Sequence, residues 1–266
     1  MKAIRLGNKI ITILVKDRAY YPGRLMMDTF AIIARCGILL TLYWYVFRLD
    51  GGTVNGVTFP IVAWSMFFYF TFSVFRLRDI SRMIMQDVQS GNVEVLFSKP
   101  VSYLSYRMWW QVGSGLYSFV VISTVGTIVL ALIVGFPATM LRALFIPTFL
   151  LVVLLSIFLS LFLYTIVGLL SFWIEDNKPV FWVVDKAIMI LGGSYLPVAL
   201  FPSLMYGIAL WSPFGASQFM THTVYSTWAG EWLLKTGIQF FWVVVTALIT
   251  LLLFLKARKH VSVNGG

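Results

Sequence analysis

The chain has 266 residues, of which 60% are hydrophobic and only 11% are charged, with a formal net charge of +10. Soluble domains carry charge on about a quarter of their residues, so this composition excludes an ordinary soluble protein and indicates an integral membrane protein. A helix needs about 20 apolar residues to cross the hydrocarbon core, which allows several spans but no appended enzyme domain. The sequence therefore predicts an all-α polytopic membrane protein whose residues 1–266 form a single transmembrane domain.

The first 22 residues predict a helix that lies flat in the inner membrane interface. Lys2, Arg5, Lys9, Thr12 and Lys16 recur at spacings of three and four, which places them on one helix face. Apolar residues fall largely opposite, and lysines on such a helix reach toward anionic headgroups. The alternative is a basic leader that only sets the topology.

Six apolar segments follow as predicted spans, over residues 25–47, 57–75, 109–134, 145–173, 180–195 and 232–255. With the amino terminus inside, fifteen Lys and Arg residues flank the spans on the cytoplasmic side and three on the other side. Because cytoplasmic flanks are enriched in these residues, the count favours six spans with both termini cytoplasmic.

The largest predicted cytoplasmic loop, residues 76–107, contains an amphipathic pattern. Ile80, Met83, Ile84 and Val88 follow helical spacing, and Gly91 is well placed to end that helix. The pattern predicts a short helix over residues 78–90. Its apolar face would be covered either by the bilayer interface or by a groove on a soluble partner.

The segment between the fifth and sixth predicted spans, "GGSYLPVALFPSLMYGIALWSPF", is too broken for one straight helix. Gly192 and Gly193 can end the fifth helix, and Pro197, Pro202 and Pro213 each remove an amide donor. We expect a re-entrant hairpin of two short helices over residues 196–216, in the outer leaflet. The alternative is a proline-kinked second crossing, which would give seven spans.

Three ionisable residues fall within predicted spans: Arg35, Asp185 and Lys186. Inserting such a residue at the centre of a membrane helix costs about 2.5–3.5 kcal/mol of free energy, so the position of each one needs a structural or functional explanation. Arg35 is expected to face an interior cavity or a subunit interface with Asp185 as its counter-ion. The alternative is a structural pair between helices.

The chain lacks recognisable enzyme motifs. No G-x-x-x-x-G-K-[ST] phosphate loop occurs, and the two histidines, His222 and His260, fall in different predicted compartments. We therefore expect no catalytic residues, no metal site and no bound cofactor. Any ATP-driven action must come from a partner.

Four features, in this order along the chain, resemble the membrane subunits of ABC-2-type exporters. They are the basic first helix, "SGNVEVLFSKPVSYLSYR" at residues 90–107, "GGSYLPVALFP" at 192–202 and "WSPF" at 211–214. The resemblance spans essentially the whole chain and points to the six-span subgroup of bacterial or archaeal cytoplasmic membranes. It implies a permease that forms a homodimer, or a heterodimer with a sister permease, among membrane lipids. Two cytoplasmic subunits would bind ATP and Mg and drive export of a drug, lipid, glycan or peptide. No nucleic acid is expected as a partner.

The resemblance also assigns roles to the short helix at 78–90 and to the hairpin at 196–216. The helix would be the coupling helix, and the residues expected to receive the motion of the ATPase are Arg78, Ile80, Arg82, Met83, Ile84 and Asp87. The rival interpretation is an ion-driven secondary transporter or channel that uses Arg35 and Asp185. Secondary transporters commonly show repeats with paired broken helices, whereas this sequence shows one broken segment and no evident repeat.

Overall fold

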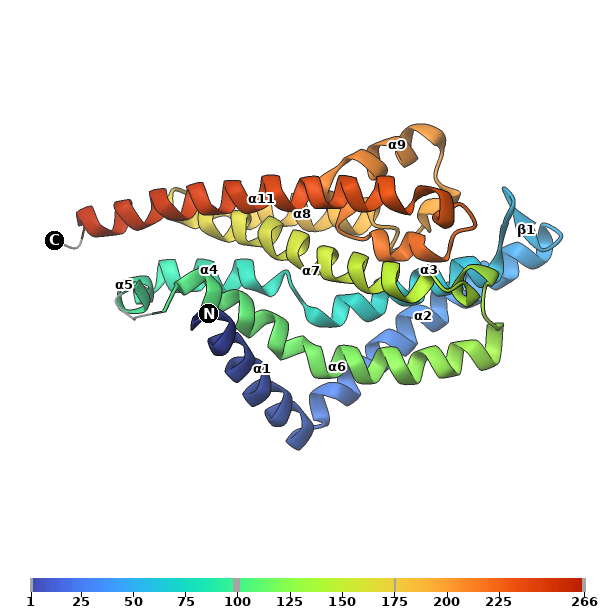
Figure 1. Ribbon diagram of the computed structural model, residues 1–266, viewed down its shortest axis with the longest axis horizontal. Coiled ribbons are helices and arrows are strands. Elements are labelled where there is room, and N and C mark those ends of the chain that lie inside the picture. The colour runs from blue at the N-terminus through green and yellow to red at the C-terminus, as the bar shows by residue number, and fades with distance from the viewer. Residues whose placement is uncertain (1, 98–100, 175, 265–266) are drawn as a thin grey trace.

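Helices make up most of the chain in the computed structural model, which describes residues 2–97, 101–174 and 176–264 (Figure 1). The α-helices are α1 (Lys2–Tyr20), α2 (Gly23–Leu49), α3 (Phe59–Phe72), α4 (Asp79–Gln89), α5 (Asn92–Phe97), α6 (Tyr103–Val134), α7 (Phe145–Leu169), α8 (Lys178–Leu191), α9 (Ser203–Trp211), α10 (Pro213–Ala216) and α11 (Trp228–Asn264). Short 3₁₀ turns are η1 (Ser73–Phe75), η2 (Ala138–Leu141), η3 (Leu170–Phe172), η4 (Val198–Leu200) and η5 (Phe219–Val224). A hairpin of β1 (Thr53–Val54) and β2 (Val57–Thr58) follows α2.

Five helical segments in the described residues are long and apolar enough to cross a membrane. They are Leu25–Leu49, Phe59–Gln89, Tyr103–Val134, Phe145–Phe172 and Trp228–Lys259. These segments contain all or most of five of the six predicted spans, which confirms the prediction of a multi-span helical protein. The remaining predicted span, residues 180–195, corresponds to α8, whose 14 residues cover about 21 Å, less than the hydrocarbon thickness.

The molecule is elongated, and different elements lie at its two ends (Figure 1). We call the end with α4, α5 and the carboxyl end of α11 the α4 end, and the end with the β1–β2 hairpin the β1 end. α11 starts at the β1 end and runs the length of the molecule. Between α8 and α11 the described residues form only short helices and 3₁₀ turns, so whether this part of the chain crosses once, as the sequence predicts, stays a prediction.

α7 forms the centre of the bundle. Its sequence is apolar around the whole circumference, and it packs against α11, α4 and η5. Val152, Ser156 and Leu159 have no exposed surface. A helix that is hydrophobic on every side is typical of the interior of a large protein or of a membrane span, and α7 agrees with a span because Ile146, Leu150 and Leu154 remain exposed.

α1 packs along α6 through glycines on both helices. A Cβ at Gly7 would lie 2.6 Å from the Trp109 ring, and a Cβ at Gly113 would lie 2.9 Å from Leu14. The apolar face predicted to enter the interface is thus partly covered by α6, with Ile10 and Leu14 buried. The exposed face keeps the basic residues, including Arg5, Lys9 and Lys16.

The chain bends sharply between α3 and α4. Arg76 adopts a left-handed backbone conformation with φ of 49°, which ends η1 and sets the direction of the next helix. The carbonyl groups freed by this break accept hydrogen bonds from Gln111 of α6, whose Nε2 lies 2.9 Å from the oxygens of both Phe75 and Arg76. Because both carbonyls have hydrogen-bond partners, the break avoids the free-energy cost of burying unpaired polar groups.

Candidate functional site

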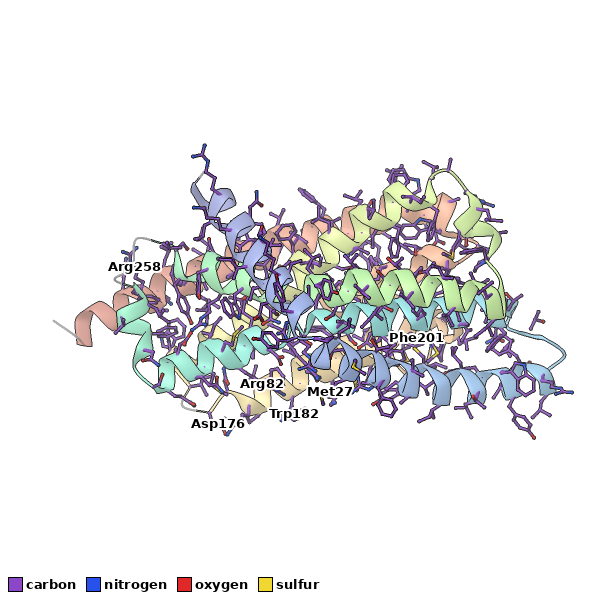
Figure 2. All side chains as sticks on the ribbon, turned by 90° about the horizontal axis from the view of Figure 1, so that it is seen from below. Met27, Arg82, Asp176, Trp182, Phe201 and Arg258 are labelled. Carbon is purple, nitrogen blue, oxygen red and sulfur yellow. The ribbon has the colours of Figure 1, made fainter. Side chains whose placement is uncertain are left out.

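A cleft of about 690 Å³ lies between α2, the α3–α4 break, α7 and α8. The segment after α8 closes part of its wall through Ser194, Tyr195 and Gln218. Figure 2 labels Met27 of α2, Arg82 of α4 and Trp182 of α8 along the same edge of the molecule, and of these three Arg82 lines the cleft. The cleft thus brings together residues from distant parts of the sequence.

All three ionisable residues predicted within spans line this cleft. Arg35 projects from α2, and Asp185 and Lys186 come from α8. Arg78 and Arg82, which the resemblance assigned to ATPase coupling, line it too. The structure therefore joins two residue sets that the sequence analysis treated as separate sites.

Asp185 is the most buried charged group of the cleft, at 5% exposure. The Tyr164 hydroxyl donates to its Oδ1 at 3.0 Å, and Arg78 and Lys186 each place a cationic nitrogen 3.9 Å from its Oδ2. The cationic nitrogens within 4 Å of Asp185 thus belong to Arg78, which directly precedes α4, and to Lys186 of α8, whereas the sequence analysis expected Arg35. Among the described residues, no ion pair joins Arg35 to a carboxylate.

Cations outnumber carboxylates in the lining. The cationic residues are Arg35, Arg76, Arg78, Arg82 and Lys186, and the carboxylates are Asp28, Asp79 and Asp185. Arg76 pairs with Asp28 at 3.0 Å, and Arg82 lies 3.6 Å from Asp79. The five positive and three negative charges leave the cleft with a net charge of +2.

α4 is a helix where one was predicted, but its apolar face is turned inward. Ile80 and Ile84 have no exposed surface, and Ile84 lies against Gly168 of α7. The structure corrects the expectation that lipid or a partner covers these two residues, because both are buried in the chain's own core. Met83 is half-buried, and the exposed side chains on α4 include Arg82 and Gln86.

Asp87 is also internal. Its carboxylate accepts hydrogen bonds from the Tyr103 hydroxyl at 2.6 Å and from Arg107 at 2.5 Å. Both donors lie in the first turns of α6, so this bonding ties the end of α4 to α6. Asp87 therefore has a structural partner within the chain and does not face outward.

The predicted helix-breaking residues lie where α8 and the short helices end or begin. Gly192 follows the last residue of α8, and Gly193 adopts φ of +83°, which favours glycine. Pro197 precedes η4, Pro202 precedes α9 and Pro213 is the first residue of α10. The two short helices expected over residues 196–216 correspond to α9 and α10.

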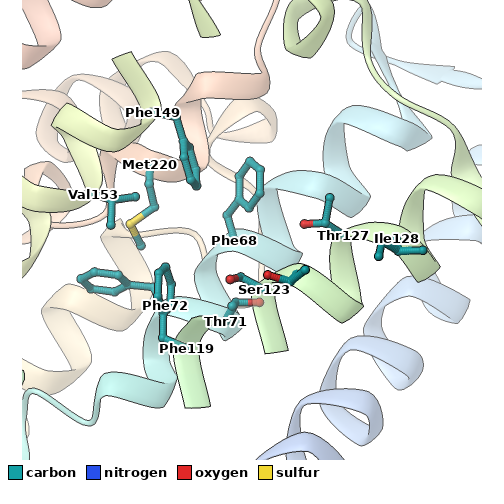
Figure 3. Close-up of a pocket in the computed structure, with 11 residues that line it drawn as sticks. Phe68, Thr71, Phe72, Phe119, Ser123, Thr127, Ile128, Phe149, Val153 and Met220 are labelled. Atoms are coloured by element: carbon teal, nitrogen blue, oxygen red, sulfur yellow. The ribbon is translucent and has the colours of Figure 1, made fainter. Parts of the chain in front are cut away.

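A second, smaller pocket lies between α3, α6 and α7. It has a volume of about 360 Å³ and is lined mainly by aromatic and aliphatic side chains (Figure 3). Phe68, Phe72, Phe119 and Phe149 surround it, with hydroxyls of Thr71 and Ser123 on one side. It contains no ionisable group and so differs in chemistry from the cleft.

Buried polar residues near the β1 end were not singled out by the sequence. Lys235 is 1% exposed and forms an ion pair of 2.7 Å with Glu231, one helical turn earlier. Gln239, which has no exposed surface, donates to Ser156 of α7 and to the Ala216 carbonyl at 2.9 Å. The apolar surroundings of these residues in the sequence gave no signal of such contacts, which depend on the tertiary arrangement.

Neither protein-family models nor curated proteins match this chain. Assignment therefore depends on the five long apolar helices and their packing. The chain is a multi-span helical membrane protein.

Proposed function

We propose that the chain is the permease subunit of an ATP-binding-cassette transporter of the ABC-2 type. A separate subunit would hydrolyse ATP, and the α4 end would face the cytoplasm. Transport would proceed as export, through a dimer with a second copy or a related permease. The large excess of Lys and Arg in the segments predicted to be cytoplasmic supports this orientation.

One observation carries the proposal: α4 connects an exposed polar surface to the charged cleft. Its outward side presents Arg82 and Gln86, while Arg78 reaches to within 3.9 Å of Asp185 in α8. The Arg82 guanidinium also lies 5.0 Å from the centre of the Phe181 ring, again in α8. A displacement of α4 by a partner would therefore act directly on one wall of the cleft.

The second candidate is an ion-driven transporter or channel, favoured by the buried carboxylate of Asp185 in a cleft open to ions. The ionic contacts of Asp185 with Arg78 and Lys186 weigh against it, because a carboxylate with cations beside it has less affinity for a transported cation. The two candidates differ in energy source, which gives a direct test.

The test is purification of the tagged chain from its native membranes in mild detergent. We expect an ATP-hydrolysing subunit to copurify, identified by mass spectrometry and by ATPase activity. A Gln86→Arg substitution on the exposed side of α4 should weaken that association about tenfold, since a bulky charge disrupts a packed contact. Thr53→Arg, an exposed position in β1 at the other end, is the matched control and should retain the subunit.

Reconstituted vesicles complete this test. Solute movement that requires ATP and the copurified subunit supports the proposal. Movement driven by an ion gradient in the absence of ATP and of any companion subunit would instead establish the second candidate.

A further inference from the structure

Arg35 is a charged residue in the middle of α2 that no carboxylate of the described residues neutralises. It lies in the middle of α2, is exposed to the cleft and forms no ion pair with a carboxylate among the described residues. An ionised group at this depth is costly and in most membrane proteins faces a cavity or a partner charge. The unpaired guanidinium therefore points to a ligand that carries negative charge.

The charges of the other cleft residues also favour a negatively charged ligand. The lining has five cationic residues and three carboxylates, and Asp185 already has Tyr164, Arg78 and Lys186 as neighbours. A cation would meet repulsion here, whereas an anion would meet Arg35 and Lys186 without displacing an existing short ion pair. Guanidinium groups bind phosphate and carboxylate in two-pronged geometry, which makes Arg35 the principal anchor.

The remainder of the cleft is suited to the apolar part of a ligand. Ile38 and Leu39 of α2, Phe70 of α3, and Ile188 and Met189 of α8 contribute apolar lining. The volume of about 690 Å³ exceeds what a small inorganic anion fills and falls in the range of pockets for organic ligands. A buried Ser160 hydroxyl, 2% exposed and without a hydrogen-bond partner in the described part of the chain, adds an open polar contact within the cleft.

We propose that this cleft is a binding site for an anionic amphiphile, with the acidic head on Arg35 and Lys186 and the apolar body along α2 and α8. The exposed apolar side chains of Met27, Phe30 and Ile33 on α2 let such a molecule reach the cleft from the bilayer. As a statement about transported cargo this inference rests on the proposed function. As a statement about binding it stands independently, so the test needs neither ATP nor a companion subunit.

The test measures binding to the full chain, purified in an uncharged detergent, by native mass spectrometry. The probes are lysophosphatidylglycerol, dodecanoate, lysophosphatidylcholine and inorganic phosphate. We expect both anionic amphiphiles to bind more tightly than the zwitterionic lipid, and phosphate without an apolar body to bind weakly. Binding of lysophosphatidylglycerol but not dodecanoate would identify a lipid headgroup as the ligand, and binding of both would extend the site to free acidic amphiphiles.

Arg35→Gln should weaken binding of the anionic amphiphiles about tenfold or more, because a hydrogen bond to a charged group is lost. It should weaken lysophosphatidylcholine binding less, because the choline cation of that lipid offsets the charge of its phosphate. Arg35→Lys keeps the charge and should restore part of the affinity. Arg142→Gln, an exposed position after η2, removes the same charge outside the cleft and is the matched control.

Equal affinity of the wild-type chain for anionic and zwitterionic probes would overturn the proposal. An equal loss in Arg142→Gln would also overturn it, because the effect would then come from net charge alone. If Arg35→Gln fails to fold, Lys186→Gln provides the same comparison. Failure of the ATPase experiment with retained anionic selectivity would refute only the transport proposal.

Discussion

At the scale of single residues, Asp87 is the strongest polar link between α4 and α6. Its side chain is 11% exposed and that of Arg107 is 17% exposed, so water screens their 2.5 Å contact only weakly. Removing one member of such a pair leaves the other charge buried and unpaired. The stability of the α4 end therefore depends on this carboxylate.

We expect Asp87→Ala to lower the free energy of unfolding by about 3 kcal/mol, in line with other broken buried ion pairs. Tryptophan fluorescence during a dodecyl sulfate titration of mixed micelles measures this change. Asp176→Ala is the control, since the Asp176–Lys178 pair is more than half exposed on both sides and should contribute less than about 1 kcal/mol. Similar losses in both variants would refute the structural role given to Asp87.

Single residues also show what the sequence could predict about the site. The sequence identified Arg35, Asp185 and Lys186 because placing an ionisable residue within a membrane span costs free energy, whichever side of the helix it occupies. Their arrangement was not identifiable, because tertiary packing brings Arg78, which precedes α4, and Tyr164 of α7 to Asp185. For the same reason, nothing in the sequence marked Ser160 as a cleft residue.

At the scale of elements, the α9–α10 pair is held by an unusually close approach. A Cβ at Gly215 would lie 2.0 Å from the Ala209 carbonyl oxygen, which belongs to the backbone and cannot rotate away. Trp242 of α11 adds a hydrogen bond from its Nε1 to the Trp211 carbonyl at 2.9 Å. These contacts fix the two short helices against each other and against α11.

Gly215→Ala should therefore destabilise the protein by at least about 3 kcal/mol, at the upper end of overpacking costs. Gly207→Ala, in α9 of the same segment, is the matched control because its Cβ would meet no atom within 4 Å. That variant should be neutral or slightly stabilising, since alanine is the better helix former. Melting temperatures in detergent compare the two, and equal melting temperatures would contradict the close packing.

Elements were predictable where apolar runs are long and less so where they are short. The positions of α2, α6, α7 and α11 followed from hydropathy within a few residues at most ends, because length and composition alone define a span. The β1–β2 hairpin was not predicted, although Asn55-Gly56 between valines is a turn signal, and both residues have positive φ. The inward orientation of α4 was not predictable, because its amphipathic pattern does not say what covers the apolar face.

At the scale of the whole molecule, charge is distributed unevenly along the long axis. Segments at the α4 end, among them the α4 region and the last turns of α11, carry most of the Lys and Arg residues outside the spans. The β1 end carries few, including Arg48 and Arg142. This asymmetry predicts which end faces the cytoplasm.

Cysteine accessibility tests that orientation and the single crossing after α8. Cys36 is the only cysteine, so Cys36→Ser gives a background for Thr53→Cys, Ser226→Cys and Gln86→Cys, all at exposed positions. An impermeant maleimide should label positions 53 and 226 in intact cells and position 86 only after permeabilisation. Labelling of position 226 only from the inside would mean that the hairpin segment crosses a second time.

The inward packing of α4 also determines how force would travel through the molecule. Ile80 and Ile84 are buried, Ile84 packs against α7, and Asp87 accepts hydrogen bonds from α6. These contacts hold α4 against its neighbours. A load on its outer side would therefore be transmitted to α6 and α7 through these contacts. Under the proposed function, such a load would change the spacing between the cleft walls that contain Arg78 and Asp185.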